Sequence, residues 1–343
     1  MPVFGALVLF LAASFGTGAP AGSLPTSFET ELARLVAPAG GTAGVSVIHL
    51  ETGAHAAVRG GEGFPMMSVY KLPIALALLH RVETGASRLD KRIRLEPSDL
   101  RLGRSPIADA HPEGSVALSV RELLEAMLVE SDNTASDVVL AEAGGPGAVT
   151  DRLRELGVEG IRVDRPEGRL ALDYVGVTDA PPESEWTLEK LRKIFAGVAP
   201  DRRAAAARAW TEDPRDTATP DAMAALLAKV ARGETLNAEH TGLVLGLLSR
   251  TTPAPGRLKG RLPADTAVAH KSGMSMSADG YTGAINDVGL ITLPGAAGRL
   301  AVAVFVKGST RDPVVVDDAV ARVARAAYDH ALAKTDAMGG GGQ

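Results

Sequence analysis

Three short motifs contain the residue types that a serine acyl-transfer site requires: Ser68-Val-Tyr-Lys71, Ser131-Asp132-Asn133 and His270-Lys271-Ser272-Gly273. A serine hydroxyl is a weak nucleophile at its ordinary pKa, so it needs a base beside it. A lysine three residues further along a helix lies on the same face as the serine. The spacing of Ser68 and Lys71 therefore predicts a nucleophile and the amine that activates it.

The chain that follows Ser68 predicts the local structure around this nucleophile. Residues 69–80 contain a long apolar run, which indicates a buried helix that begins near Ser68. The N-terminus of a helix has free backbone N–H groups and the positive end of the helix dipole. Both favour the negative charge that develops on a carbonyl oxygen during acyl transfer.

Each motif taken alone has a simpler explanation. The first fits a solvated helix face, the second fits a helix N-cap, and the third fits the end of a strand. The combination is more specific, because the order of the motifs, their separations and the elements predicted around them all fit one site.

Composition narrows the class of protein. The chain has 343 residues, of which 45% are hydrophobic and 22% are charged, as in a folded globular enzyme. The net charge of −5, without a run of basic residues, argues against a nucleic-acid partner. The absence of cysteine excludes disulfides, a lipidated cysteine and thiolate metal sites. The histidines lack metal-ligand spacing, so we expect no metal and no other cofactor.

Residues 1–21 have the pattern of a secretory signal peptide. An apolar run over residues 3–15 is too short to span a bilayer and is followed by small residues that end at Ala21. The segment before that run has no Lys or Arg, so an uncleaved anchor is the alternative. We expect a secreted or periplasmic monomer with no stable membrane insertion after cleavage.

The order of predicted elements indicates the fold. Helices are expected over residues 28–36, 236–248 and 313–333 and in pieces from 68 to 232, and strands over 43–50, 56–59, 266–271, 284–292 and 300–306. The prediction is an α/β (α+β) fold. An antiparallel sheet from both chain ends is flanked by terminal helices, and an all-helical subdomain is inserted. The three motifs would then meet in the groove between the layers.

These elements predict one catalytic domain, residues 22–338, and a flexible tail, 339–343. Its sheet part comprises residues 27–62 and 236–335, and its helical part residues 63–235. Both tryptophans fall within residues 172–215, where a helix over 187–196 and another that Asp201 caps are expected. We interpret this segment as a helical hairpin with its own small core. An aromatic lid over the groove is the alternative.

The motifs and their wider context resemble the class A serine β-lactamases of the penicillin-recognising enzyme family. The resemblance spans roughly residues 27–333 and includes Met67-Ser-Val-Tyr-Lys-Leu-Pro-Ile-Ala, His111-Pro-Glu-Gly, Ala269-His-Lys-Ser-Gly and Asn286-Asp-Val-Gly-Leu-Ile-Thr-Leu-Pro. It implies a cofactor-free hydrolase whose partner is a small β-lactam.

The resemblance implies a role for each matched residue in catalysis. Ser68 would attack the lactam carbonyl and form an acyl-enzyme. Lys71, or Glu167 through a water molecule, would take the proton of the serine. Ser131 would pass a proton to the departing lactam nitrogen.

Substrate binding is implied for Asn133, Lys271, Ser272 and Arg257. Asn133 would bind the side-chain amide of the substrate, while Lys271 and Ser272 would meet its carboxylate. The arginine matches a residue that binds this carboxylate in some members, and its alternative is a solvated loop charge. The backbone N–H groups of Ser68 and Met274 would form the oxyanion hole.

Glu167 decides whether the acyl-enzyme turns over, because hydrolysis of the ester requires a base that activates water. Its segment, Asp164-Arg-Pro-Glu167, resembles the family's omega loop, and a surface turn is the alternative. Ala171 stands where the family commonly has an asparagine that helps to hold the water, and a methyl group cannot form hydrogen bonds. The alternative function is therefore a related serine hydrolase, a D,D-peptidase-like protein or an acyl trap with little turnover.

Two further departures concern the range of substrates. Arg104 replaces an aromatic residue that commonly forms a wall of the site, and the 172–215 segment is expected to lengthen the connection after the omega loop.

Overall fold

A six-stranded antiparallel sheet forms the centre of the molecule, and the computed structural model describes residues 26–339. The predicted signal peptide and residues 340–343 lie outside the described part. The strand order is β2 (His55–Val58), β1 (Thr42–His49), β10 (Arg299–Ser309), β9 (Tyr281–Thr292) and β7 (Val268–Met274), with β8 (Ser277–Ala278) paired to β9. This confirms the predicted sheet built from both ends of the chain.

Alternation along β10 shows why these residues form a sheet between two layers. Val302, Val304 and Val306 belong to one hydrophobic core, whereas Ala301, Ala303 and Phe305 belong to another. Successive side chains of a strand point to opposite faces, so both faces of this strand are buried. The sheet therefore separates two hydrophobic cores.

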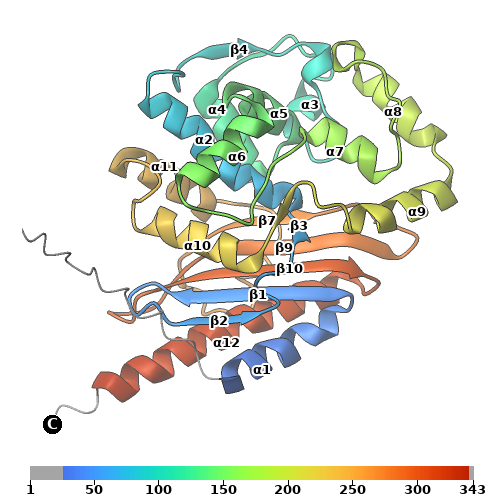
Figure 1. Ribbon diagram of the computed structural model, residues 1–343. Helices are drawn as coiled ribbons and strands as arrows, with labels where there is room; N and C mark the ends of the chain where they lie inside the picture. Colours follow the sequence, from blue (N-terminus) through green and yellow to red (C-terminus); the bar gives the residue numbers. More distant parts are fainter. Residues whose placement is uncertain (1–25, 340–343) are drawn as a thin grey trace, which may run out of the picture.

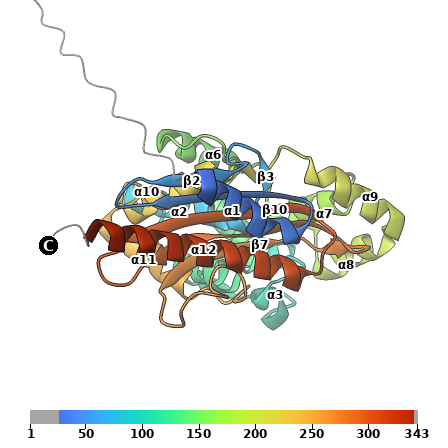
Figure 2. The same ribbon diagram turned by 90° about the horizontal axis from the view of Figure 1, so that it is seen from below.

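The first core lies between the sheet and the terminal helices α1 (Thr26–Val36) and α12 (Pro313–Gly339). The two helices run side by side across one face of the sheet (Figures 1 and 2). Phe28 of α1 stacks on His330 of α12 with the ring centroids 4.0 Å apart. The last helix is longer than predicted, because it continues past residue 333 to Gly339, the expected start of the tail.

The second core lies between the opposite face of the sheet and the helical block (Figure 1). The larger helices of this block are α2 (Lys71–Glu83), α5 (Asn133–Glu142), α6 (Gly145–Glu155), α7 (Glu167–Tyr174), α8 (Leu188–Gly197), α9 (Pro200–Thr211), α10 (Pro220–Ala231) and α11 (Ala238–Ser249). The shorter helices and turns of this block are α3 (Pro106–Ala110), α4 (Val120–Glu125), η2 (Met67–Tyr70), η3 (Pro97–Asp99), η4 (Ala126–Glu130) and η5 (Glu183–Glu185). A further turn, η1 (Ala37–Ala39), follows α1 and belongs to the first core. Two short ribbons pair β3 (Phe64–Pro65) with β6 (Thr217–Ala218) and β4 (Arg92–Arg94) with β5 (Ala117–Ser119).

Local capping explains where several helices begin. Ser119 and Glu122 form a capping box at the start of α4, because the Ser119 side chain accepts from the N–H of Glu122 and the Glu122 side chain accepts from the N–H of Ser119. The prediction that Asp201 caps α9 is wrong. Pro200 occupies the first helical position, which suits its fixed φ, and Asp201 lies within the first turn.

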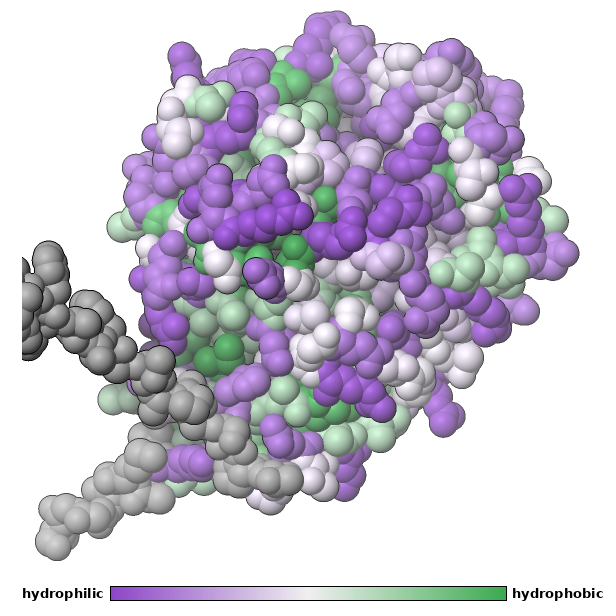
Figure 3. All heavy atoms as spheres, in the orientation of Figure 1, coloured by the Kyte–Doolittle hydropathy of each residue, from purple (hydrophilic) through white to green (hydrophobic). Residues whose placement is uncertain are grey.

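The face in Figure 3 is mostly hydrophilic, and its hydrophobic residues form small separate spots. Within residues 26–339, no helix combines the length and the apolar character needed to cross a bilayer.

Candidate active site

Ser68 lies in the single turn η2, directly before the regular helix α2 begins at Lys71. The preceding residue, Met67, has φ of +48°, a left-handed conformation that is uncommon for a residue with a side chain. Such strained backbone is concentrated at functional sites, where the surrounding packing holds it. Ser68, the predicted nucleophile, therefore lies in a strained turn at the N-terminal end of α2.

A cavity of about 480 Å³ opens at Ser68, between the helical block and the edge strand β7. Predicted site residues that line it are Ser68, Ser131, Asn133, Glu167, Arg257, Ser272 and Met274. Lys71 and Lys271 are fully buried. All three motifs and the Glu167 segment thus meet at one pocket.

The two lysines converge on the hydroxyl of Ser131. Lys271 Nζ donates to Ser131 Oγ at 2.9 Å, and Lys71 Nζ lies 3.4 Å from the same oxygen. Ser131 itself has φ of +61° and follows the π-helical turn η4. Asp132, which is completely buried, caps α5 by accepting from the N–H of Ala135 at 2.8 Å. This cap fixes the loop that presents Ser131.

The surroundings of Lys71 hold its amine in place. Its Nζ donates to the Ser131 carbonyl at 2.8 Å and to Asn133 Oδ1 at 2.9 Å. Burial lowers the pKa of Lys71, although the charges of Glu167 and Asp132 oppose the shift. The pKa of Lys271 is lowered well below its ordinary value by burial and then by the charge of Lys71. A lowered pKa makes the neutral form of each amine easier to reach, and the neutral amine is the form that accepts a proton.

Strand β7 brings backbone donors next to the nucleophile. Ser275 N–H donates to the Ala284 carbonyl of β9. In an antiparallel pair the N–H of the preceding residue, Met274, therefore points away from β9. Gly273 packs so tightly that a Cβ would lie 2.6 Å from the Met66 carbonyl and 3.0 Å from Ser68 N. This close approach requires glycine and brings the backbone of Ser68 next to β7, the strand that contains Met274.

Glu167 begins helix α7, and two neighbours fix it. Asp137 of α5 accepts from the N–H groups of Glu167 and Gly168 and so caps α7 from another helix. The hydroxyl of Tyr70 donates to Glu167 Oε2 at 3.0 Å. Burial raises the pKa of Glu167, whereas the charge of Lys71 lowers it. Glu167 is 6% exposed, so the alternative of a surface turn is wrong.

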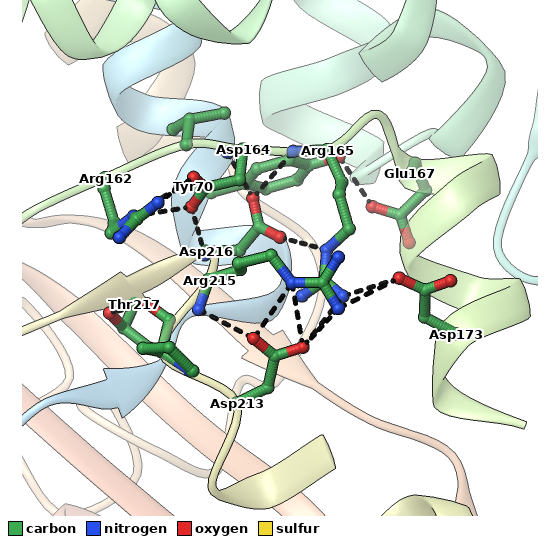
Figure 4. Close-up of polar contacts among 12 residues, drawn as sticks. Tyr70, Arg162, Asp164, Arg165, Glu167, Asp173, Asp213, Arg215, Asp216 and Thr217 are labelled. Carbon is green, nitrogen blue, oxygen red and sulfur yellow. Dashed lines mark hydrogen bonds and ion pairs between the residues drawn. The ribbon is translucent and has the colours of Figure 1, made fainter. Parts of the chain in front are cut away.

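Arg165 closes the loop that contains Glu167 (Figure 4). Its guanidinium donates to Asp216 at 2.6 Å and to Asp173 at 2.8 Å, and Asp213 lies 3.2 Å away. Residues 172–215, expected to lengthen the chain after this loop, lie in the sequence between Arg165 and Asp216. Helices α8 and α9 lie inside a loop whose ends are tied together by the Arg165–Asp216 pair.

The inserted helices contribute both a core and one residue of the pocket wall. Trp186 and Trp210 are buried, and Trp210 packs edge-on against Tyr174 with ring centroids 5.1 Å apart. These tryptophans are packing anchors, as the hairpin interpretation predicts. Phe195 of α8 lines the pocket, so a different aromatic residue of the insertion reaches the groove.

Arg257 lies at the pocket, and each nitrogen of its guanidinium has a partner. It donates to Asp317 of α12 at 2.7 Å and to the Gly273 carbonyl at 3.1 Å. Only 4% of Arg257 is exposed, so the alternative of a solvated loop charge is wrong. The two residues that depart from the family, Arg104 and Ala171, also line the pocket.

Two contacts of Glu167 were not predicted from the sequence. Tyr70 lies within the apolar run of residues 69–80, and no motif includes Asp137. The only signal was a hydroxyl-bearing residue inside the nucleophile motif and a carboxylate one turn after Asn133. Among the described residues, no three His, Asp or Glu side chains are grouped to hold a metal ion.

A serine, two buried lysines, a second serine and a carboxylate around one pocket define a serine acyl-transfer hydrolase. The chain belongs to the beta-lactamase enzyme family, which its residues 27–331 match. It is 32% identical over 279 residues to the extended-spectrum beta-lactamase PER-1 of Pseudomonas aeruginosa, a match that covers 81% of this chain and 78% of the relative.

Solved structures agree with this membership. A beta-lactamase from Chitinophaga pinensis superposes with a TM-score of 0.74 and 30% identity, over 89% of this chain and 100% of that one. An ancestral class A beta-lactamase gives a TM-score of 0.70 and 33% identity, over 88% of this chain and 99% of that one. The class A resemblance stated from the motifs is confirmed.

Proposed function

We propose that the protein hydrolyses β-lactams through a covalent ester on Ser68, which a water molecule activated by Glu167 then cleaves. The observation that supports this most directly is the shared pocket of Ser68, Ser131 and Glu167, with both lysine amines on the Ser131 hydroxyl. The match to beta-lactamases supports β-lactams as the class of substrate.

In the acylation step, Ser68 Oγ forms a bond to the lactam carbonyl carbon and the ring C–N bond breaks. Lys71, whose pKa is lowered by burial, takes the hydroxyl proton directly, or Glu167 takes it through a water. Ser131 donates a proton to the departing nitrogen and recovers one from the lysines that contact it. The N–H groups of Ser68 and Met274 stabilise the oxyanion.

Substrate recognition uses the cationic side of the same pocket. Lys271 and Ser272 bind the substrate carboxylate, and the buried Arg257, whose charge is paired with Asp317, lies in the same pocket. Asn133 shares its amide between Lys71 and the substrate side chain.

In the deacylation step, water forms a bond to the ester carbon and gives a proton to Glu167. The ester C–O bond breaks, and Ser68 recovers a proton. The base must be ionised, and Lys71 supports this form because its positive charge lowers the pKa of Glu167. Burial opposes this effect and places the carboxylate in a dry environment, where it is a stronger base.

The decisive experiment mixes purified protein with a chromogenic cephalosporin and compares product with enzyme concentration. We expect many turnovers per enzyme. Glu167→Gln, which keeps the shape of the side chain, should stop after a burst equal to the enzyme and leave a mass adduct on Ser68. Unchanged steady-state hydrolysis by this variant would remove Glu167 from its role.

Ala171 favours a second candidate, an acyl trap or D,D-peptidase-like protein that forms the ester but releases it slowly. Its methyl group lines the pocket and offers no hydrogen bond to a water. A stable Ser68 adduct in the wild-type protein, without turnover, selects this candidate.

We also propose that the protein is exported. The support is the apolar segment and small residues of the first 21 positions. Expression in a Gram-negative host should give a periplasmic protein that begins at Gly22. A full-length chain in the membrane fraction would indicate an uncleaved anchor instead.

A further inference from the structure

A buried tyrosine hydroxyl contacts the carboxylate proposed as the deacylation base. Tyr70 has no exposed surface, and its hydroxyl donates to Glu167 Oε2 at 3.0 Å (Figure 4). The hydroxyl oxygen of Tyr70 also lies 3.3 Å from Ser136 Oγ on α5. Tyr70 stands two residues after Ser68, in the turn that presents the nucleophile.

The environment keeps Tyr70 protonated, so it acts only as a donor toward Glu167. Burial raises the pKa of this phenol well above its ordinary value, and the charges of Glu167 and Asp137 raise it further. A neutral donor to a buried carboxylate stabilises the ionised form and restrains its orientation.

The contact also gives the two oxygens of the Glu167 carboxylate different surroundings. Tyr70 occupies Oε2, and within the described part of the chain no side chain or backbone group donates to Oε1. Glu167 lines the pocket, so Oε1 is the atom left to take a proton from water. Ala171, which lines the same pocket, has no polar side-chain atom to assist.

We propose that Tyr70 is a positioning residue for deacylation, which holds Glu167 ionised and oriented through its donated hydrogen bond. The inference rests on the proposed function of Glu167. It implies that the turn η2, which contains Ser68, also helps to orient Glu167.

The groups around Glu167 determine its pKa, and through it the pH dependence of kcat. Lys71 on α2 and the Tyr70 hydroxyl lower the pKa of Glu167, whereas burial, Asp137 on α5 and Asp216 raise it. Loss of the hydroxyl therefore raises the pKa of Glu167. Because the ionised form is active, the acid limb of kcat moves to higher pH in Tyr70→Phe.

The test is Tyr70→Phe, measured with the chromogenic cephalosporin in pre-steady state and by mass spectrometry of quenched samples. We expect kcat to fall about 10- to 100-fold, the size of a hydrogen bond to a charged group. The rate of the acylation burst should change little, the Ser68 adduct should accumulate, and the acid limb of kcat should shift upward in pH. Wild-type kcat with an unshifted pH profile would overturn the inference.

Tyr281→Phe is the matched control, because Tyr281 is also buried and its hydroxyl donates to Thr211 Oγ1 at 2.8 Å. We expect this variant to keep the wild-type kcat and pH profile. An equal loss in both variants would mean that a missing buried hydroxyl merely loosens the protein, and would defeat the proposal.

The double variant Tyr70→Phe/Glu167→Gln separates this inference from the proposed function. If Tyr70 acts through Glu167, the double variant should release the adduct no more slowly than Glu167→Gln alone. Independent, multiplying effects would refute the coupling while leaving the proposed function intact. Turnover that persists in Glu167→Gln would defeat both.

Discussion

The Arg165 guanidinium and the Asp216 carboxylate form a buried ion pair, with 2.6 Å between Nε and Oδ2, although 51 residues separate them in the chain. Asp216 also accepts from the backbone N–H groups of Asp164 and Arg165. The pair ties the base of the loop that contains Glu167, α8 and α9. The insertion can therefore extend from the molecule without displacing Glu167.

Arg165→Ala is expected to lower the free energy of unfolding by about 3–5 kcal/mol, because it leaves a buried carboxylate at Asp216 without its counter-ion. The activity should fall as well, since Glu167 follows two residues later. Urea unfolding monitored by fluorescence measures the first effect, and kcat measures the second.

Arg162→Ala is the control for that variant. Arg162 forms its ion pair with Asp164 at the surface, where half of its side chain is exposed, so its loss should cost less than about 1 kcal/mol. Similar, small losses of stability in the two variants would contradict a structural role for the Arg165 pair.

Lys271→Ala should lower kcat/KM at least about 100-fold, the lower range for the loss of a proton-transfer group. The variant removes the donor that lies 2.9 Å from Ser131 Oγ and, in the proposed mechanism, a contact to the substrate carboxylate. Single-turnover measurement of the acylation rate is the direct readout.

Lys229→Ala provides the comparison, because Lys229 pairs with Glu234 near the surface and away from the pocket. It should leave the acylation rate unchanged. An acylation rate in Lys271→Ala equal to that of the wild type would exclude Lys271 from the reaction.

Most of the fold could be predicted from the sequence because it follows from local patterns. Apolar runs with β-branched residues predict the strands, and the Ser119 capping box marks the start of α4. The motifs locate Ser68 and Lys271 because neighbours in the sequence define them.

The contacts that orient Glu167 are not local, so the sequence did not reveal them. Asp137 caps α7 from a different helix. Arg165 forms its ion pair with Asp216, which lies on the other side of the insertion in the sequence. Tyr70 fits the apolar run in which it occurs. Its hydroxyl meets an acceptor only because the tertiary structure brings Glu167 of α7 next to it. Pairings of this kind depend on tertiary structure, which periodicity and propensity do not encode.

Phe195→Ala and Trp186→Ala should separate the two tasks of the insertion. Phe195 lines the pocket and is half-buried, so its truncation should change KM for bulky cephalosporins about 5-fold, equivalent to roughly 1 kcal/mol of apolar contact. Trp186 is 1% exposed and stacks under Arg101, so its truncation should cost about 3–5 kcal/mol of stability. Unchanged KM values in Phe195→Ala would show that α8 does not contact substrate.

The pair of His55 on β2 and Asp221 on α10 gives a prediction about stability and pH. His55 Nε2 lies 2.9 Å from Asp221 Oδ1, and both side chains are partly exposed. The hydrogen bond to Asp221 raises the pKa of His55, and the same bond lowers the pKa of Asp221.

The two shifts define the pH window in which the pair stabilises the fold. The contribution of His55 is fully present below its unfolded pKa of about 6.5 and is lost as pH rises through the higher folded pKa. The contribution of Asp221 is present above its unfolded pKa of about 3.9 and is lost as pH falls through the lower folded pKa. The pair should therefore stabilise most between about pH 4 and 6.5.

His55→Gln should consequently lower the stability by about 0.2–1 kcal/mol at pH 5.5, the range for exposed pairs, and by less at pH 8.5. Urea unfolding of both proteins at the two pH values measures the difference. Because Gln retains a hydrogen-bond donor but cannot become charged, the variant isolates the protonation of the histidine. A stability difference that is constant from pH 5.5 to 8.5 would show that the charge of His55 contributes nothing.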